Sequence, residues 1–372
     1  MKGQRKLRVH RTRKKKQGPW KENFGYSLLK FFVDFGTGMS YRRVRTEGRE
    51  NIPDTSKNAV IISPNHCNTL LDALVVLRSR QGKTVFGARA DLFNTKAVAA
   101  IMRFLRIVPM VRRRDGLREV LRNYDTMDEI NDVLANGVAY CMFPEGTHRP
   151  MHSLLPINKG IFRMSLSAND YMDGRKDVIV VPCGLEYGDY FHYRSWLRIR
   201  YGKGINVSQF LRDNPELSEP EVYNTLRLKL KDSMAALITY FPDDGGYEAS
   251  WQEFQGKFKA LTGRTYRDAG LPQGKAARAL LAAVTFPFFL LSAFLTLPMW
   301  CIGELLCHAK IRDKAVRNTA RLAVKLVGLL IMGIVWAVVF FTKLPWWGAI
   351  IALVYSFFSY AIFYDWLNLV RK

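Results

Sequence analysis

His66 and Asp72, in the stretch SPNHCNTLLDAL (residues 63–74), are of the types that form a general-base pair. His66 lies in the turn after an apolar run, and Asp72 lies in the first turn of a predicted helix. A carboxylate that binds one imidazole nitrogen leaves the other nitrogen free to accept a proton. A structural histidine at a turn fits this stretch equally well, so the pair alone does not establish catalysis.

A second polar turn follows another predicted strand, in VAYCMFPEGTHRP (residues 138–150). Gly146 permits close approach of the backbone to a ligand. Glu145 is able to orient a hydroxyl group or a neighbouring cation. This second turn favours the catalytic interpretation of the first.

Together, these stretches resemble the glycerophospholipid acyltransferase superfamily, which includes lysophosphatidate and glycerol-3-phosphate acyltransferases. Asn65-His66 with Asp72 matches its first motif, and FPEGT matches its glutamate motif. VPMVRRRDG resembles its arginine motif, and VVPCGLEY resembles its last motif, a strand with a central Pro182. The four motifs occur in the family's order, between about residues 40 and 205.

The resemblance implies direct acyl transfer from a thioester, either acyl-CoA or acyl-carrier protein, with no cofactor and no metal. His66 would remove the proton of the acceptor hydroxyl while its oxygen attacks the thioester carbonyl. Asp72 would keep the imidazole in the correct tautomer and stabilise its cation. Backbone amides near the motifs would stabilise the oxyanion.

The resemblance also assigns an acceptor site. Arg112 would bind the acceptor's phosphate, helped by Arg114 and Lys159, because guanidinium groups suit bidentate contacts. A solvated basic surface is the alternative interpretation of these cations. The other residues assigned by motif position are Asn65, Glu145, Gly146 and Thr147 as substrate-binding residues, and Pro144 and Pro182 as structural positions.

One departure concerns the spacing of the first motif. Five residues separate His66 from Asp72, whereas the commonest family form has four. A branch of glycerol-3-phosphate acyltransferases resembles the longer form, so the departure bears on the substrate rather than on activity. We expect the turn before the helix to absorb the extra residue. Cys67 adjoins His66 and suggests a nucleophile, but family members do without a thiol there.

The charge of the chain indicates a polyanionic partner. Lys and Arg number 56 against 32 Asp and Glu, a net charge of +24. Residues 1–22 are predicted to form a flexible basic arm. Zinc-finger spacing and RNP-like aromatic stretches are missing from the sequence, so acidic lipid headgroups are the favoured partner and no nucleic acid is expected. The five cysteines show no framework spacing, which favours reduced thiols facing the cytosol.

Two apolar stretches, residues 279–303 and 326–364, are long enough to cross a membrane. The second divides into residues 326–342 and 344–364, which predict a transmembrane hairpin that turns at FTKLPWWG. Residues 279–303 contain no charge, but Pro287 and Pro298 interrupt them and basic residues flank both ends. We expect a re-entrant or interfacial element there, with a third span as the alternative.

The remaining organisation is that of an α/β protein. Residues 23–45 predict an amphipathic helix lying in the membrane interface. Residues 46–215 alternate short apolar runs with helical patterns, which predicts a largely parallel sheet flanked by helices. The predicted strands are NAVIIS, TVFGA, RIVPMV, VAYCMF, VIVVPCGLEY and WLRIRYG. Residues 216–270 predict a helical extension, and residues 271–372 a helical membrane region.

These features predict a membrane-bound O-acyltransferase of phospholipid biosynthesis that forms phosphatidate from lysophosphatidate. Glycerol 3-phosphate or another lysophospholipid is the alternative acceptor. The expected surroundings are membrane phospholipids, with the catalytic domain facing the cytoplasm at the cell membrane. A non-catalytic membrane tether with a basic arm is the alternative of another class. A tether has no need of His66, Asp72 and Glu145 together.

Overall fold

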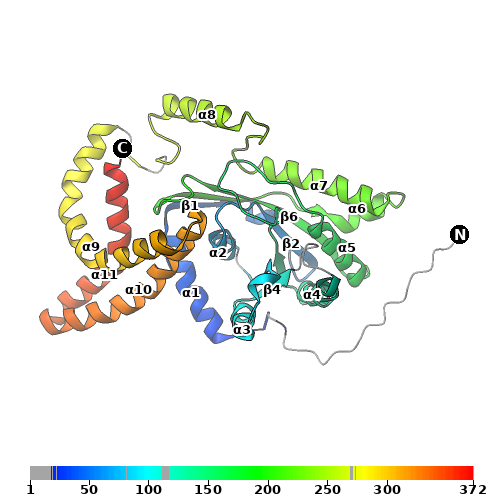
Figure 1. The fold of residues 1–372 in the computed structure, drawn as a ribbon, viewed down its shortest axis with the longest axis horizontal. Coiled ribbons are helices and arrows are strands. Elements are labelled where there is room, and N and C mark those ends of the chain that lie inside the picture. The colour runs from blue at the N-terminus through cyan, green and yellow to red at the C-terminus, as the bar shows by residue number, and fades with distance from the viewer. Residues whose placement is uncertain are drawn as a thin grey trace.

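The computed structural model describes residues 18, 20–21, 23–80, 82–110, 117–268, 271–272 and 274–371. The predicted basic arm at residues 1–22 lies almost entirely outside the described residues. Figure 1 shows helices α9, α10 and α11 gathered at one end of the molecule and α5, α6 and α7 at the other, with the sheet between them.

A single sheet forms the centre of the described chain, with the strand order β1-β7-β6-β2-β5-β3-β4 and with β8 paired to β6. The pairs from β6 through β2, β5 and β3 to β4 are parallel. Strand β7 is antiparallel to β6, and β1 is parallel to β7. The strands are β1 Tyr41–Glu47, β2 Asn58–Pro64, β3 Thr84–Arg89, β4 Ile107–Met110, β5 Ala139–Cys141, β6 Asp177–Tyr187, β7 Ser195–Tyr201 and β8 Ile205–Asn206. The predicted largely parallel sheet is confirmed.

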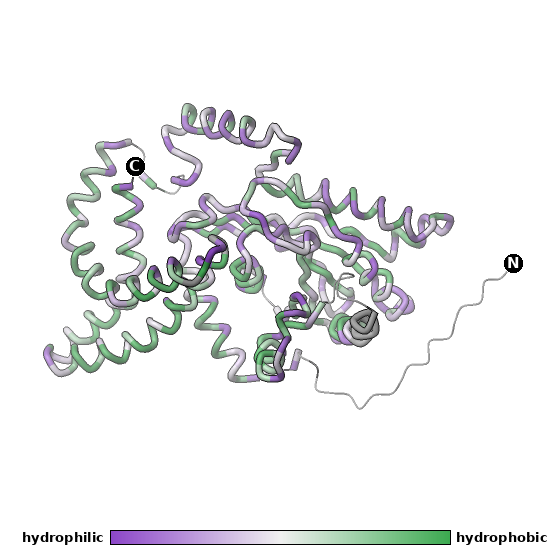
Figure 2. The backbone as a smooth tube through the Cα atoms, viewed as in Figure 1, coloured by the Kyte–Doolittle hydropathy of each residue, from purple (hydrophilic) through white to green (hydrophobic). Residues whose placement is uncertain are grey.

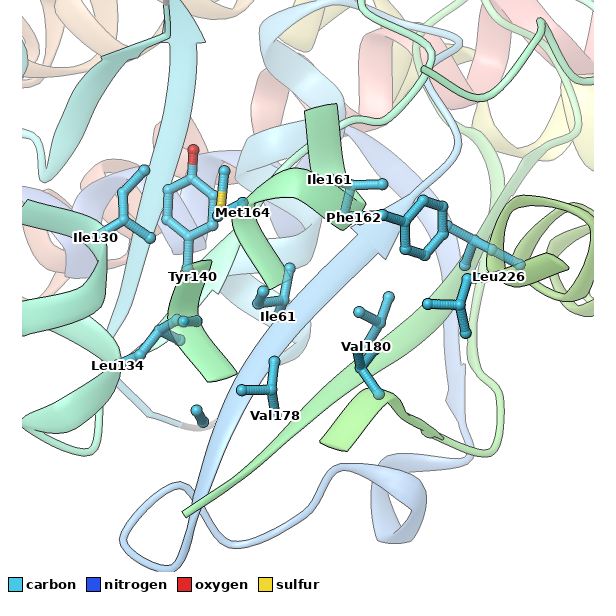
Figure 3. Close-up of a cluster of buried hydrophobic side chains, with 14 of the residues drawn as sticks. Ile61, Ile130, Leu134, Tyr140, Ile161, Phe162, Met164, Val178, Val180 and Leu226 are labelled. Carbon is cyan, nitrogen blue, oxygen red and sulfur yellow. The ribbon is translucent and has the colours of Figure 1, made fainter. Parts of the chain in front are cut away.

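A hydrophobic core lies on each face of the sheet, which explains why the sequence of β2 is continuously apolar. Ile61 of β2 faces a core that also contains Ile130, Phe162 and Leu226, as Figure 3 shows. Its neighbours Val60 and Ile62 face the second core. The first core is covered by α4 Leu117–Ala135, α5 Gly160–Met172, α6 Val207–Asp213 and α7 Glu219–Ala235, and the second by α2 Leu70–Ser79.

The predicted interfacial helix is shorter than expected. Helix α1 spans Phe24–Met39, and β1 begins at Tyr41, so the helix prediction for the last residues of 23–45 is wrong. Those residues alternate between exposed and half-buried positions, with the period of two that an edge strand shows. Phe24 and Phe31 of α1 are 83% and 66% exposed, an apolar surface that fits a helix at a membrane interface.

Several short helical elements complete the α/β domain and its extension. They are the 3-10 turns Arg49–Asn51 and Ala90–Leu92, α3 Lys96–Phe104 and α8 Tyr247–Thr262. Helix α7 begins with a capping box in which Ser218 and Glu221 bind each other's backbone. The predicted helical extension thus contains two helices, α7 and α8, joined by a loop.

Three C-terminal helices are each long and apolar enough to cross a membrane: α9 Lys275–Lys310, α10 Lys314–Lys343 and α11 Trp346–Val370. Figure 2 shows apolar residues along much of all three. The break between α10 and α11 falls at Leu344 and Pro345, within the predicted turn. Helix α10 begins twelve residues before the predicted span, at Lys314 rather than near residue 326.

Helix α9 runs through both of its prolines and is bent (Figure 1). Near its start, the Ala282 carbonyl accepts a hydrogen bond from Trp366 of α11 at 2.9 Å. Near its end, Glu304 binds Arg321 of α10 through two contacts of 2.8 Å. Trp366 and Arg321 lie toward the ends of α11 and α10 that contact the sheet domain, so both ends of α9 lie at that side of the hairpin. This arrangement fits the predicted re-entrant element, and its position in a membrane stays a prediction.

Candidate active site

The predicted pair His66 and Asp72 is brought together. Strand β2 ends at Pro64 and α2 begins at Leu70, which leaves His66 in the connecting turn. The Asp72 carboxylate oxygen Oδ2 lies 2.7 Å from His66 Nδ1. The Asp72 side chain is fully buried, whereas that of His66 is 18% exposed. With Nδ1 donating to the carboxylate, Nε2 is the nitrogen that can accept a proton.

Four donors surround the buried Asp72 carboxylate. Oδ2 also accepts the backbone amides of Cys67 at 2.8 Å and Asn68 at 2.6 Å. Oδ1 accepts the hydroxyl of Tyr187 at 2.6 Å. Burial, with the Asp72 charge, raises the pKa of Tyr187 and keeps this hydroxyl protonated. The four hydrogen bonds replace the water that a buried carboxylate loses and fix its orientation toward His66.

The additional residue between His66 and Asp72 is accommodated in the turn, as expected. Thr69 directly precedes α2 and has φ 50° and ψ −126°, a conformation that side-chain-bearing residues rarely adopt. Because the turn folds back over Asp72, the backbone amides of Cys67 and Asn68 point at the carboxylate. The longer spacing therefore preserves the pair.

Glu145 supports the same turn from the end of β5. One carboxylate oxygen accepts the backbone amide of His66 at 2.9 Å, and the other accepts that of Leu155 at 2.9 Å. Burial raises the pKa of Glu145 to about 7, although the two amide contacts act in the opposite direction. This geometry makes Glu145 a positioning residue for His66. Its predicted contact with the acceptor stays a prediction.

Gly146 follows with φ +70°, a conformation that favours glycine. A Cβ at this position would lie 2.9 Å from the side-chain nitrogen of Asn158. That nitrogen donates to the Glu145 carbonyl at 2.9 Å, and the Asn158 amide donates to the Pro144 carbonyl. Pro144 and Gly146 thus keep the glutamate turn tight.

Asn65 is buried and joins the turn to β6. Its side-chain oxygen accepts the Leu185 amide at 2.6 Å, and its nitrogen donates to the Leu185 carbonyl at 3.0 Å. Pro182, three residues earlier on β6, pairs in register with Ser63. These contacts hold β2 and β6 together beside His66, and the predicted binding of substrate by Asn65 stays a prediction.

The remaining predicted binding residues are less constrained. Thr147 and Lys159 are exposed, the latter at the start of α5. Arg112 and Arg114 lie outside the described residues, so the predicted phosphate site stays a prediction. Burial raises the pKa of the Cys67 thiol well above its ordinary value. A thiol held in its protonated form is a poor nucleophile, which agrees with the expectation against covalent catalysis.

Sequence reasoning missed two groups of residues that contact the turn carrying His66. The His66 ring stacks on Phe143, with centroids 4.2 Å apart, and lies edge-on to His148 at 5.7 Å. His148 in turn lies 2.9 Å from Asp313, just before α10. His148 could have been proposed from the sequence because HRP directly follows the glutamate motif. No feature of the sequence pointed to Asp313.

The second missed group belongs to α10 itself. Asn318 donates to the Asn68 side chain at 3.3 Å, and the hydroxyl groups of Thr319 and Thr69 lie 3.0 Å apart. Asn318 also donates to the backbone carbonyl of Tyr190. The apolar C-terminal region therefore contacts the back of the turn that carries His66.

Sequence comparisons with known proteins agree with the motifs. Residues 43–186 match the family model described as Acyltransferase. Over 129 residues the chain is 32% identical to glycerol-3-phosphate O-acyltransferase 2 of Saccharomyces cerevisiae, a match that covers 34% of this chain and 17% of that protein. The 1-acyl-sn-glycerophosphate (LPA) acyltransferase PlsC of Thermotoga maritima superposes with a TM-score of 0.38 and 18% identity, covering 57% of this chain and 79% of that structure.

Proposed function

We propose that this chain, whose acyltransferase domain belongs to the glycerophospholipid acyltransferase superfamily, transfers a fatty acyl group from a thioester to a hydroxyl of a glycerophosphate-type acceptor. The observation that carries the proposal is the His66–Asp72 contact of 2.7 Å, held by Tyr187 on the other carboxylate oxygen. A buried carboxylate that orients a partly exposed imidazole is the arrangement that a general base requires.

In the proposed reaction, His66 Nε2 takes the proton of the acceptor hydroxyl while the hydroxyl oxygen bonds to the thioester carbonyl carbon. The carbon–sulfur bond then breaks, and the departing thiolate takes the proton from His66. Asp72 stabilises the imidazolium that exists between these two steps. The ester and a free thiol are the products, and no cofactor is consumed.

The first candidate acceptor is lysophosphatidate, which gives phosphatidate. This choice is supported by the apolar surface of α1 and by the three long apolar helices, because both suit an acceptor that is already in the bilayer. In the proposed orientation, the sheet domain faces the cytoplasm at the cell membrane, where acyl-CoA or acyl-carrier protein delivers the acyl group.

The second candidate acceptor is glycerol 3-phosphate, which gives lysophosphatidate. Two observations favour it: the similarity to the yeast glycerol-3-phosphate O-acyltransferase and the five-residue spacing between His66 and Asp72. Both acceptors carry a phosphate group and a free hydroxyl, so the same catalytic pair serves either one.

The test measures thiol release by the purified chain from acyl-CoA and from acyl-carrier protein, with lysophosphatidate and glycerol 3-phosphate offered separately. His66→Ala should lower the rate by about 100- to 10,000-fold. His308→Ala removes a histidine that is 69% exposed on α9 and should keep the wild-type rate. The acceptor that supports release names the substrate. Equal rates in wild type and His66→Ala would contradict the proposal and favour the tether.

A further inference from the structure

An open groove lies at the β1 edge of the sheet. Strands β1 and β7 form one wall, and the segment from α8 to Tyr266 forms the other, around a volume of about 210 Å³. Its lining, which also includes Leu197 between Trp196 and Arg198 on β7, combines three arginines with three aromatic side chains: Arg43, Arg45, Arg198, Trp196, Phe258 and Tyr266. We refer to this set as the arginine groove.

The arginine groove and the His66 pair lie on opposite faces of the sheet. Side chains alternate along β7, so Leu197 points to one face and its neighbours Trp196 and Arg198 point to the other. Leu197 pairs with Tyr187 of β6, and both are buried in the core beside α2. Because Tyr187 binds Asp72, the arginine groove is separated from the catalytic pair by the sheet itself.

The charges of the arginine groove are only partly compensated. Arg198 binds the buried carboxylate of Glu186 at 2.5 Å, and Arg200 reaches the same oxygen at 3.2 Å. Glu186 also accepts hydrogen bonds from Tyr266 and from the Thr239 amide. Its single negative charge is therefore shared between two arginines.

Arg43 and Arg45 are exposed on the edge strand, paired in register with Trp196 and Arg198. Among the described residues, neither of their side chains makes a hydrogen bond or an ion pair. Glu47 is the acidic residue on the same side of β1, beyond Arg45 and in register with Arg200. Two guanidinium groups without an ion-pair partner among the described residues therefore lie beside aromatic side chains. This arrangement is suited to binding a phosphate group.

Contacts on both sides tie the arginine groove to the apolar helices. Arg42, on the opposite face of β1, binds Asp365 at 2.7 Å near the end of α11. On the other wall, Asp268 follows Tyr266 by two residues and binds Arg278 in the first turn of α9 at 3.4 Å. Leu261, in the last turn of α8 and five residues before Tyr266, is 86% exposed. The groove thus lies close to the paired ends of two helices that are long enough to cross a bilayer.

We propose that the arginine groove binds the phosphate headgroup of an anionic phospholipid in the surrounding bilayer. The two arginines hold the phosphate, and the half-buried rings of Trp196 and Phe258 supply aromatic surface of the kind found at a membrane interface. The position beside the paired ends of α9 and α11 favours a lipid over a soluble phosphate compound. This site is independent of acyl transfer, so its test does not depend on the proposed function.

The experiment titrates dansyl-labelled phosphatidylglycerol into the full chain in neutral-detergent micelles and follows energy transfer from the tryptophans. Each basic residue near an anionic surface contributes roughly fivefold to affinity. Arg43→Ala with Arg45→Ala should therefore weaken binding about 25-fold. The control, Arg49→Ala with Lys57→Ala, removes the same charge from exposed positions outside the groove and should change binding less than twofold.

Three outcomes would overturn the proposal. Equal losses in the two double variants would indicate general attraction to a basic surface. Binding of labelled phosphatidylcholine as tight as that of phosphatidylglycerol would exclude recognition of anionic charge. Displacement of the lipid from wild type, but not from Arg43→Ala with Arg45→Ala, by millimolar inorganic phosphate or coenzyme A would identify a soluble occupant. Circular dichroism of each variant checks that the fold is intact.

Discussion

The Tyr187 hydroxyl donates to Asp72 Oδ1 at 2.6 Å, the carboxylate oxygen that His66 does not contact. Tyr187 lies on β6, 115 residues from Asp72 in the sequence. It therefore links the last family motif to the first. A hydrogen bond to a charged group is worth about 1.5 to 3 kcal/mol, enough to influence how firmly Asp72 is held.

Tyr187→Phe should lower kcat for acyl transfer by about tenfold and leave KM unchanged, because Asp72 keeps its other three donors. The matched control is Tyr201→Phe, which removes a buried hydroxyl that binds Ser79 at 2.6 Å and not Asp72. Steady-state thiol release measures both constants. A similar kcat loss in the two variants would mean that Tyr187 acts through general stability.

Glu145→Gln should change how stability depends on pH. The folded-state pKa of about 7 lies above the ordinary value of 4.5, because burial disfavours the carboxylate. The contribution of Glu145 to folding stability is therefore complete below about pH 4.5 and falls as pH rises through about 7. Burial lowers the pKa of His152 to about 4, and this group acts with the opposite sign over an overlapping range.

The measured quantity is therefore the difference in melting temperature between wild type and Glu145→Gln from pH 5 to pH 8. Wild type should lose stability relative to the variant as pH rises, since only wild type carries the titrating carboxyl group. Two melting curves that stay parallel over this range would show that Glu145 titrates elsewhere.

Thr69 stores backbone strain that glycine would release. At φ 50° and ψ −126°, a residue with a side chain costs roughly 1 to 3 kcal/mol. Thr69→Gly and Thr69→Ala both lose the hydroxyl contact with Thr319, so their comparison isolates the backbone. We expect the glycine variant to be more stable than the alanine variant by about 1 kcal/mol in denaturant unfolding. Equal stabilities would contradict the strain.

Thr69 and Thr319 should be coupled energetically, because their hydroxyl groups lie 3.0 Å apart. A double-mutant cycle of Thr69→Ala and Thr319→Ala should give a coupling energy of about 0.5 to 1.5 kcal/mol. Thr342→Ala, at the far end of α10, is the control and should combine additively with Thr69→Ala. Additive effects of Thr69→Ala and Thr319→Ala would show that α10 and the turn are independent.

The sequence predicted β2 from its continuous apolar run VIIS, and it predicted β7 from the alternating apolar residues of WLRIRYG. Strand β1 was missed because four of its seven residues are charged: Arg42, Arg43, Arg45 and Glu47. Charged residues are common on edge strands. Local pattern does not reveal which residues a neighbouring strand will later cover.

The same distinction holds for the candidate site. His66, Asp72 and Glu145 were predicted because they lie in short motifs with recognisable spacing. Asn318 binds the turn from 250 residues away, and its helix begins before the apolar stretch that marked the span. Such contacts arise only when α10 packs on the sheet domain, so spacing along the chain carries no sign of them.

If α10 crosses the bilayer in the proposed orientation, it also sets the depth of the catalytic pair. Its 30 residues are about 45 Å long, whereas a bilayer's hydrocarbon core is about 30 Å thick. In the proposed orientation, with Lys343 at the far interface, Asn318 and Thr319 reach the layer of lipid headgroups. Through Asn68 and Thr69 they hold His66 at that level. An acceptor confined to the bilayer then meets the enzyme by lateral diffusion, a search in two dimensions instead of three.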